Sequence, residues 1–164
     1  MQKYIVGFLV GRFQPFHKGH LHLIKESFQY IKTMIIGVGS VGVVNGDNFL
    51  SYQQRKKILE TVIKKEGWSD KVSKVVPLKD FNDDKLWLIH CLEVAGKIDV
   101  VIGNNEWTNG IFERAGYPVL RLGFYKRYLY EGVKIRGLLK SGKRWEDRMP
   151  RYIVELLHSY IVKD

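Results

Sequence analysis

The chain has 164 residues, 45% of them hydrophobic, and a single cysteine, so we expect one compact domain over residues 1–164, without a disulfide, in a reducing cytoplasm. Its net charge of +10 favours anionic ligands, but the basic residues are spread along the chain without the signature of a nucleic-acid-binding module, so we expect phosphorylated small molecules and no nucleic acid. No apolar stretch approaches the roughly 20 residues that cross a bilayer, and the N-terminus lacks a signal-peptide pattern, so we expect neither membrane association nor secretion.

The first half of the chain alternates strand patterns with helix patterns. Short apolar runs predict buried strands at 4–10, 34–38 and 72–76. Apolar residues at helical spacing predict two helices between these strands, and their core faces carry Leu21, Ile24, Phe28 and Ile31 in the first and Ile58, Leu59, Val62 and Ile63 in the second. Ser51 and Gln54 form a capping box where the second of these helices begins.

The second half continues the alternation and ends in helices. A helix is expected from Asp84, a good N-cap, to Gly96, a good C-terminal stop. Two further strands are predicted at 98–102 and 118–122, with a short helix around 111–114 between them, and after a basic and aromatic loop the chain closes with helices at 133–139 and after Pro150.

This order of elements predicts an α/β fold. Strands that alternate with helices form right-handed crossovers, so we expect a Rossmann-like, doubly wound parallel sheet with helices on both faces and a C-terminal helical segment. In such sheets, ligands bind outside the carboxyl ends of the strands, where the winding direction reverses. Functional residues are therefore expected directly after strands.

The loop after the first predicted strand carries the strongest functional pattern. His17 and His20 are three residues apart where a helix begins, so both side chains can point the same way beside free backbone N–H groups, which bind anions. The two imidazoles can donate to phosphate oxygens, and Arg12 adds a forked, charged donor. Gly11 and Gly19 allow a nucleotide to lie against the backbone. Two incidental surface histidines are the weaker interpretation of this spacing.

The same loop resembles a known family signature. Residues 11–20 read G-R-F-Q-P-F-H-K-G-H, which resembles the signature of the nucleotidyltransferase superfamily with the H-x-G-H motif and is very similar to that of its archaeal-type nicotinamide mononucleotide adenylyltransferases. Further segments resemble that family's landmarks in its order: Gly39-Ser40, 80–87, Gly103-Asn104 and Phe124-Tyr125. The resemblance implies transfer of the adenylyl group of ATP to nicotinamide mononucleotide, giving NAD and pyrophosphate. It also implies Mg²⁺, or a similar divalent cation carried by ATP, no dedicated metal ligands, and a homo-oligomer.

The resemblance also assigns roles to the matching residues. The expected ATP-binding residues are Gly11, Arg12, Phe13, His17, Gly19, His20, Gly103, Asn104, Tyr125, Gly132, Val133 and Arg136. Of these, the expected catalytic donors are Arg12, His17, His20 and Arg136. The acceptor is expected at Asp80, Asp84, Trp87 and Lys134, where the Trp87 indole can stack on a nicotinamide ring. An ordinary packed helix face and a simple N-cap remain alternative interpretations of Trp87 and Asp84.

Residues of these types suit adenylyl transfer. The second pKa of an acceptor phosphate is near 6, so the phosphate is already largely anionic at neutral pH and needs no general base. The protein has to position two polyanions and stabilise charge on the transferred phosphoryl group. Histidines and arginines without a catalytic carboxylate fit that requirement.

Two departures from the family pattern leave other functions open. The family pattern S-G-T-x-x-R is matched by Gly132 and Arg136, whereas Glu131 and Val133 replace its two hydroxyl residues. The loop 41–48 also has no basic residue, where archaeal relatives often carry a phosphate-binding arginine. Two alternatives follow: another acceptor, such as a flavin nucleotide, phosphopantetheine or a phosphorylated alcohol, or a non-catalytic regulator that binds a nucleotide.

Overall fold

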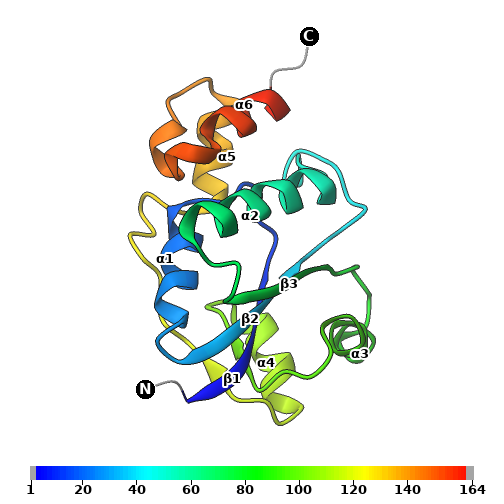
Figure 1. The fold of residues 1–164 in the computed structure, drawn as a ribbon. Helices are drawn as coiled ribbons and strands as arrows, with labels where there is room; N and C mark the ends of the chain where they lie inside the picture. Colours follow the sequence, from blue (N-terminus) through cyan, green and yellow to red (C-terminus); the bar gives the residue numbers. More distant parts are fainter. Residues whose placement is uncertain (1–2, 162–164) are drawn as a thin grey trace.

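The computed structural model describes residues 3–161, which are built around a parallel sheet (Figure 1). Its strands are β1 (Tyr4–Gly11), β2 (Ile31–Val38), β3 (Val72–Pro77), β4 (Val100–Ile102) and β5 (Val119–Leu120). They are hydrogen-bonded in the order β3-β2-β1-β4-β5, and every pair is parallel. The winding direction therefore reverses between β1 and β4, which confirms the predicted α/β, doubly wound sheet.

Helices cover both faces of the sheet. They are α1 (Lys18–Ser27), α2 (Tyr52–Glu66), α3 (Asp84–Ala95), α4 (Glu106–Arg114), α5 (Gly132–Lys140) and α6 (Val154–Ile161), with short 3-10 turns at Glu146–Arg148 and Arg151–Ile153. Figure 1 shows α5 and α6 together at the top of the view, above α2, and α3 and α4 at the opposite end. None of these helices is long and apolar enough to span a bilayer within the described residues.

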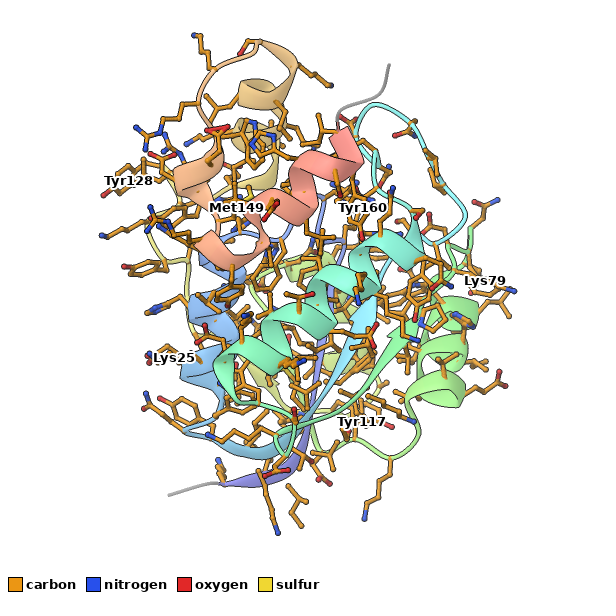
Figure 2. The ribbon with its side chains drawn as sticks, turned by 45° about the horizontal axis from the view of Figure 1, so that its top comes forward. Lys25, Lys79, Tyr117, Tyr128, Met149 and Tyr160 are labelled. Atoms are coloured by element: carbon orange, nitrogen blue, oxygen red, sulfur yellow. The ribbon has the colours of Figure 1, made fainter. Side chains whose placement is uncertain are left out.

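Side chains of β1 alternate between two hydrophobic clusters, one on each face, as successive strand residues point to opposite sides. Leu9 packs in the larger cluster with residues of α1, α2, α5 and α6, including Ile24, Ile58, Ile135 and Leu157. Met149, labelled in Figure 2, is also buried there. Phe8 packs in the second cluster with residues of α3 and α4, including Trp87, Cys91, Ile111 and Phe112. The two clusters hold the strand ends in place from both sides.

At two glycines in the strands, large apolar side chains pack directly against the backbone of the sheet. A Cβ on Gly7 would lie 2.7 Å from Cδ1 of Ile102, and a Cβ on Gly37 would lie 2.7 Å from Cδ1 of Leu78. Both distances are shorter than carbon atoms tolerate, so these positions accept no side chain without a shift of the core.

Several predicted boundaries are wrong in detail. Ile31, predicted on the face of the first helix, begins β2, because α1 ends at Ser27 and a helical spacing happens to continue across the turn. The N-cap of α3 is Asp83 rather than Asp84, since its Oδ1 accepts the N–H groups of Lys85 and Leu86.

The elements near β4 and β5 differ as well. The helix predicted around 111–114 begins at Glu106. The prediction missed its first turn because the residues there are polar and do not show the apolar helical spacing. The strands predicted at 98–102 and 118–122 are only three and two residues long. β4 ends at Ile102 as predicted, whereas β5 ends at Leu120, two residues before the predicted end. The two strands are parallel neighbours, so their carboxyl ends still lie at the same edge of the sheet.

Candidate functional site

A cavity of about 690 Å³ opens at the carboxyl ends of β1 and β4, where the winding direction reverses. Its volume falls in the range of roughly 300–1,000 Å³ that is usual for small-molecule sites, so it can hold a nucleotide. Of the residues predicted to bind ATP, those that line it are Gly11, Phe13, His17, Gly19, His20, Gly103, Asn104, Tyr125 and Gly132. The structure thus brings together residues from four separate predicted loops.

The two histidines of the β1–α1 turn lie face to face. Their ring centroids are 3.7 Å apart and their planes differ by 24°. His17 is the N-cap of α1, and its Nδ1 accepts the N–H of Gly19 at 3.1 Å, while Nδ1 of His20 accepts the N–H of His17 at 3.1 Å. Since each Nδ1 accepts, the neutral rings carry their proton on Nε2. Both side chains therefore offer an Nε2–H donor to a ligand.

Burial keeps both imidazoles neutral. Burial, with a smaller contribution from the charge of Arg136, lowers the pKa of His17 to about 4. Burial also lowers the pKa of His20 well below its usual value, with a smaller effect from His17. The N–H groups of His17 and Gly19 are occupied by these rings, so the expectation of free N–H groups beside the histidines is wrong for these two groups. An anion bound at this helix start would therefore contact the imidazole N–H donors rather than these two backbone N–H groups.

The two predicted catalytic arginines lie beside the cavity without lining it. Nη1 of Arg136 donates to the carbonyl of Gln14 at 3.0 Å, and a Cβ on Gly132 would lie 2.8 Å from that same Nη1, so glycine is what leaves room for the guanidinium. Arg12 is exposed, and its Nη1 donates to Oδ1 of Asn48 at 3.4 Å. Burial lowers the pKa of Arg136, with a smaller lowering from the charge of Arg12.

The start of α5 is more open. Its N-cap, Glu131, makes no side-chain hydrogen bond to the helix and instead lies 3.6 Å from Nζ of Lys134 and 3.7 Å from Nη2 of Arg127. Glu131 and Gly132 line the cavity, whereas Val133 is 65% exposed and, like Lys134, lies outside the lining. Of the predicted residues here, the structure brings only Gly132 into the cavity wall.

The predicted acceptor residues lie outside the cavity lining. Oδ1 of Asp80 accepts the hydroxyl of Ser40 at 3.0 Å, and Asp84 is 3.9 Å from Nη2 of Arg114 on the surface. Trp87 is 5% exposed and packs against Trp107 and Phe112. Its contacts are those of a packed helix face, which is the alternative interpretation stated for this residue.

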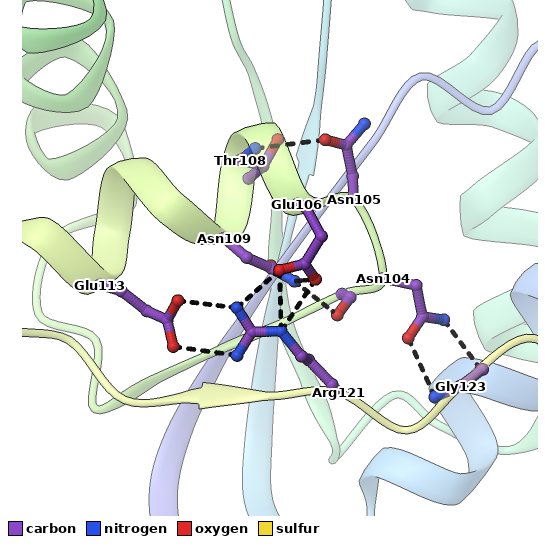
Figure 3. Close-up of polar contacts among 9 residues, drawn as sticks. Asn104, Asn105, Glu106, Thr108, Asn109, Glu113, Arg121 and Gly123 are labelled. Atoms are coloured by element: carbon purple, nitrogen blue, oxygen red, sulfur yellow. Dashed lines mark hydrogen bonds and ion pairs between the residues drawn. The ribbon is translucent and has the colours of Figure 1, made fainter.

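A polar network stiffens the wall after β4 and β5 (Figure 3). The side-chain amide of Asn104 donates to the carbonyl of Gly123 at 2.8 Å and accepts its N–H at 3.0 Å. Arg121 donates to both carboxylate oxygens of Glu106 and of Glu113 at distances from 2.7 to 3.1 Å. These charge-assisted, two-pronged contacts fix the segments that follow the two strands. Asn104 thus lines the cavity while its amide is engaged by the protein.

Sequence patterns missed several residues of the cavity wall, among them Leu23, Asn105, Glu106, Thr108, Asn109, Arg127 and Tyr130. Arg127 lies in the loop 124–130, whose basic and aromatic composition was a usable signal; its guanidinium sits 4.0 Å from the ring centre of Phe124. In the same loop, Tyr125 stacks on His22 at 4.0 Å, and Tyr128, labelled in Figure 2, is 69% exposed. At the start of α4 the usable signal was Asn105, a favoured N-cap residue whose side chain accepts the N–H of Thr108.

The sequence is similar to a known protein family and to proteins of known name. The cytidylyltransferase-like family matches residues 8–122. The nicotinamide-nucleotide adenylyltransferase of Archaeoglobus fulgidus is 32% identical over 92% of this chain and 88% of that protein. The protein of the same name from Thermoplasma acidophilum is 35% identical over 92% of this chain and 84% of that protein.

A solved structure has a similar fold. The bifunctional NMN adenylyltransferase/ADP ribose pyrophosphatase of Francisella tularensis superposes with a TM-score of 0.81 at 24% sequence identity. The match covers 98% of this chain and 51% of that protein, so the chain spans about half the length of the bifunctional protein.

Proposed function

Because this chain belongs to the cytidylyltransferase-like family and groups with its nicotinamide-nucleotide adenylyltransferases, we propose that it transfers the adenylyl group of ATP to nicotinamide mononucleotide, giving NAD and pyrophosphate. The observation that carries the chemistry is the β1–α1 turn. Two neutral imidazoles with fixed tautomers stand in a nucleotide-sized cavity at the switch point of the sheet. Such a site can hold a triphosphate without a titrating group of its own.

In the proposed reaction, a phosphate oxygen of the acceptor forms a bond to the α-phosphorus of ATP. The bond from that phosphorus to the oxygen bridging to the β-phosphate breaks, and pyrophosphate leaves with its electron pair. Charge builds on the oxygens around the α-phosphorus, where Nε2–H donors of His17 and His20 stabilise it. We propose Arg12 and Arg136 as the cationic donors to the same phosphates.

The binding residues are proposed on the same basis. The nine predicted ATP contacts that line the cavity support placing the nucleotide there, with Arg12, Val133 and Arg136 at its edge. We propose the acceptor side at Asp80, Asp84, Trp87 and Lys134. The hydrogen bond between Ser40 and Asp80 supports this side, because it links the loop after β2 to the segment before α3.

We propose that a divalent cation, Mg²⁺ or similar, accompanies the triphosphate and supplies charge neutralisation. Among residues 3–161, no three His, Cys, Asp or Glu side chains gather in a way that could hold a metal. We propose that the ion is held mainly by phosphate oxygens and water, as Mg²⁺ usually is. Glu106 and Glu131 line the cavity, but we propose neither as a metal ligand, because both carboxylates pair with cations of the chain.

Other features of the proposal concern the whole molecule. We propose that residues 1–164 form one nucleotidyltransferase domain, that it works in the cytoplasm as a homo-oligomer, and that it binds neither nucleic acid nor membranes. The single sheet with a core cluster on each face supports the first point. The spread of basic residues along the chain supports the absence of a nucleic-acid partner.

A pyrophosphate-release assay tests the function. The purified protein is given ATP, Mg²⁺ and nicotinamide mononucleotide, and both pyrophosphate and NAD are measured. We expect equal amounts of the two products. Flavin mononucleotide, phosphopantetheine and a phosphorylated alcohol are tested in parallel; turnover of one of these in place of nicotinamide mononucleotide identifies another acceptor. Nucleotide binding without pyrophosphate from any acceptor would identify a non-catalytic regulator.

A further inference from the structure

Arg55, in the first turns of α2, is a buried cation with an unusual set of partners. Its side chain is 1% exposed, and no carboxylate of the described residues lies within ion-pair distance of it. Three carbonyl oxygens accept from it instead: Nη1 donates to Arg12 at 2.9 Å and to Gly39 at 2.6 Å, and Nε donates to Ser51 at 3.3 Å. Its Nη2 is buried without a hydrogen-bond partner.

Stability alone does not account for this residue. A buried charge whose nearest opposite charge, that of Asp80, lies beyond ion-pair distance is unfavourable, and an apolar side chain of similar size often stabilises a fold better. A cation near a helix N-terminus also opposes the helix dipole. Ile58 and Leu59, one turn further along α2, are fully buried in the main hydrophobic cluster, so the helix does pack apolar residues against the sheet. Arg55 therefore has a role that an apolar side chain cannot fill.

The two inter-loop contacts of Arg55 fall on strained turns. The carbonyl of Arg12 precedes Phe13, whose φ is 53°, and the carbonyl of Gly39 precedes Ser40, whose φ is 54°. Left-handed backbone is unfavourable for residues other than glycine and persists where the surroundings hold it. The turns follow the neighbouring strands β1 and β2, and the N–H of Gly39 donates to the carbonyl of Gly11 at 2.9 Å. One guanidinium thus holds both turns in register.

These two turns contain residues of the proposed catalytic site. Arg12 stands between Gly11 and Phe13, which both line the cavity, and Ser40 donates to Asp80. We propose that Arg55 is a positioning residue for adenylyl transfer, which by gripping the main chain of Arg12 and Gly39 aims the Arg12 guanidinium at the phosphates. The inference rests on the proposed function. Arg55 itself touches no substrate and acts through Arg12.

A double-mutant cycle tests this role. Arg55→Lys keeps the charge but loses the forked grip, and Arg55→Met removes the charge at similar length. Each is made in the natural protein and in Arg12→Ala, with the exposed Lys57→Met on the same helix as control. We expect kcat/KM for nicotinamide mononucleotide to fall about 10- to 100-fold for both Arg55 variants, as for other residues that orient a reacting group. In the Arg12→Ala background the same changes should lower it by less than about threefold.

Amide hydrogen exchange gives a second readout that needs no turnover. In Arg55→Lys we expect faster exchange at Gly39 and Val41, whose N–H groups donate to the carbonyls of Gly11 and Leu78, with core strand amides unchanged. An equal loss of activity in both backgrounds would overturn the proposal, as would unaltered exchange at these two amides. Global unfolding of both variants by circular dichroism would also overturn it, because Arg55 would then serve the fold. Failure of the natural protein and of Lys57→Met to make NAD is a different result, which refutes the proposed function.

Discussion

The starts of α1 and α5 both face the cavity, yet they are built in opposite ways. At α1, His17 and His20 satisfy backbone N–H groups with their Nδ1 atoms and are held by burial. At α5, Glu131 makes no capping bond and reaches only ion-pair partners at 3.6 and 3.7 Å. The first N–H groups of a helix have no partner within the helix, so those of α5 are left for a ligand.

This difference separates two tasks in one cavity. The α1 start offers donors of fixed direction and constant charge, which suits the reacting α-phosphorus, where geometry decides the rate. The α5 start offers backbone N–H groups and the buried Arg136, which suits a triphosphate, but it also carries the carboxylate of Glu131. Changes at α1 should therefore alter turnover, and changes at α5 should alter mainly ATP affinity.

The largest effect is expected at α1. His20→Ala removes one Nε2–H donor and the acceptor of the His17 N–H. Loss of one donor to a developing charge typically raises a barrier by about 3–4 kcal/mol, so kcat should fall on the order of 100- to 1,000-fold with little change in the KM for ATP. Steady-state kinetics of the folded variant measure this, with His158→Ala, at the far helix α6, as control. Near-normal turnover in folded His20→Ala would remove this histidine from the mechanism.

A pH experiment tests whether the α1 start is really neutral. Between pH 6.5 and about 4, the unfolded chain binds a proton at His17 that the folded chain does not, because burial lowers the folded pKa to about 4. Stability is therefore lost as the pH falls through this window, by about 3 kcal/mol at 1.36 kcal/mol per pKa unit.

The matched variant for this test is His17→Asn, since asparagine can cap the helix but does not titrate. Urea unfolding of both proteins at pH 7, 5.5 and 4 gives the free energies of unfolding. We expect the natural protein to lose about 3 kcal/mol more than the variant over this range. Parallel curves would mean that His17 is not held neutral in the fold.

The third effect is expected at α5. Arg136→Ala removes a cation from the proposed triphosphate site, and a hydrogen bond to a charged group contributes about 1.5–3 kcal/mol. The KM for ATP should rise about 10- to 100-fold, more than kcat falls. The control is Lys140→Ala, one turn further on, because Lys140 and Arg136 each lie 3.9 Å from Asp47 but Lys140 is exposed. Equal effects of the two variants would reduce Arg136 to a general surface charge.

The smallest effect is expected for a change at Glu131, and it bears most directly on the difference between the starts of α1 and α5. Glu131→Ser restores a hydroxyl that can cap α5 and removes a carboxylate from the cavity wall. The partly exposed ion pairs that are lost contribute little, about 0–1 kcal/mol. We expect ATP to bind about three- to tenfold more tightly, as measured by calorimetry, with Glu155→Ser in α6 as control. Weaker binding would show that Glu131 contributes to the site, for instance by contacting the divalent cation.

The sequence was sufficient to predict the sheet and the edge of it at which the cavity opens. Apolar runs and capping residues are local signals, and a doubly wound sheet places the loop after β1 at the switch point whatever the side chains do later. The prediction missed the start of α4 because Glu106 and Asn109 are polar for reasons of tertiary contact, although Asn105 is a typical N-cap residue. Asn109, for example, is buried against the carbonyl of Gly103.

The protonation states of the histidines and the hydrogen-bond partners of Arg55 could not be predicted from the sequence. The spacing of His17 and His20 indicates a shared direction, but which ring nitrogen accepts, and that both rings are neutral, depends on backbone N–H groups and burial. Arg55 occurs in a helix pattern as an ordinary surface cation, and only the fold shows it 1% exposed with its guanidinium on two other loops.

The strand glycines have a consequence for how this protein can evolve. At Gly7 and Gly37, even a methyl group would overlap Ile102 or Leu78. These positions lie in β1 and β2 and do not line the cavity, yet a saturation library selected for activity should favour glycine there. A preference for one residue in such a library can therefore arise at a cavity residue that contacts substrate or at a crowded position in the core. Only the structure distinguishes these two kinds of position.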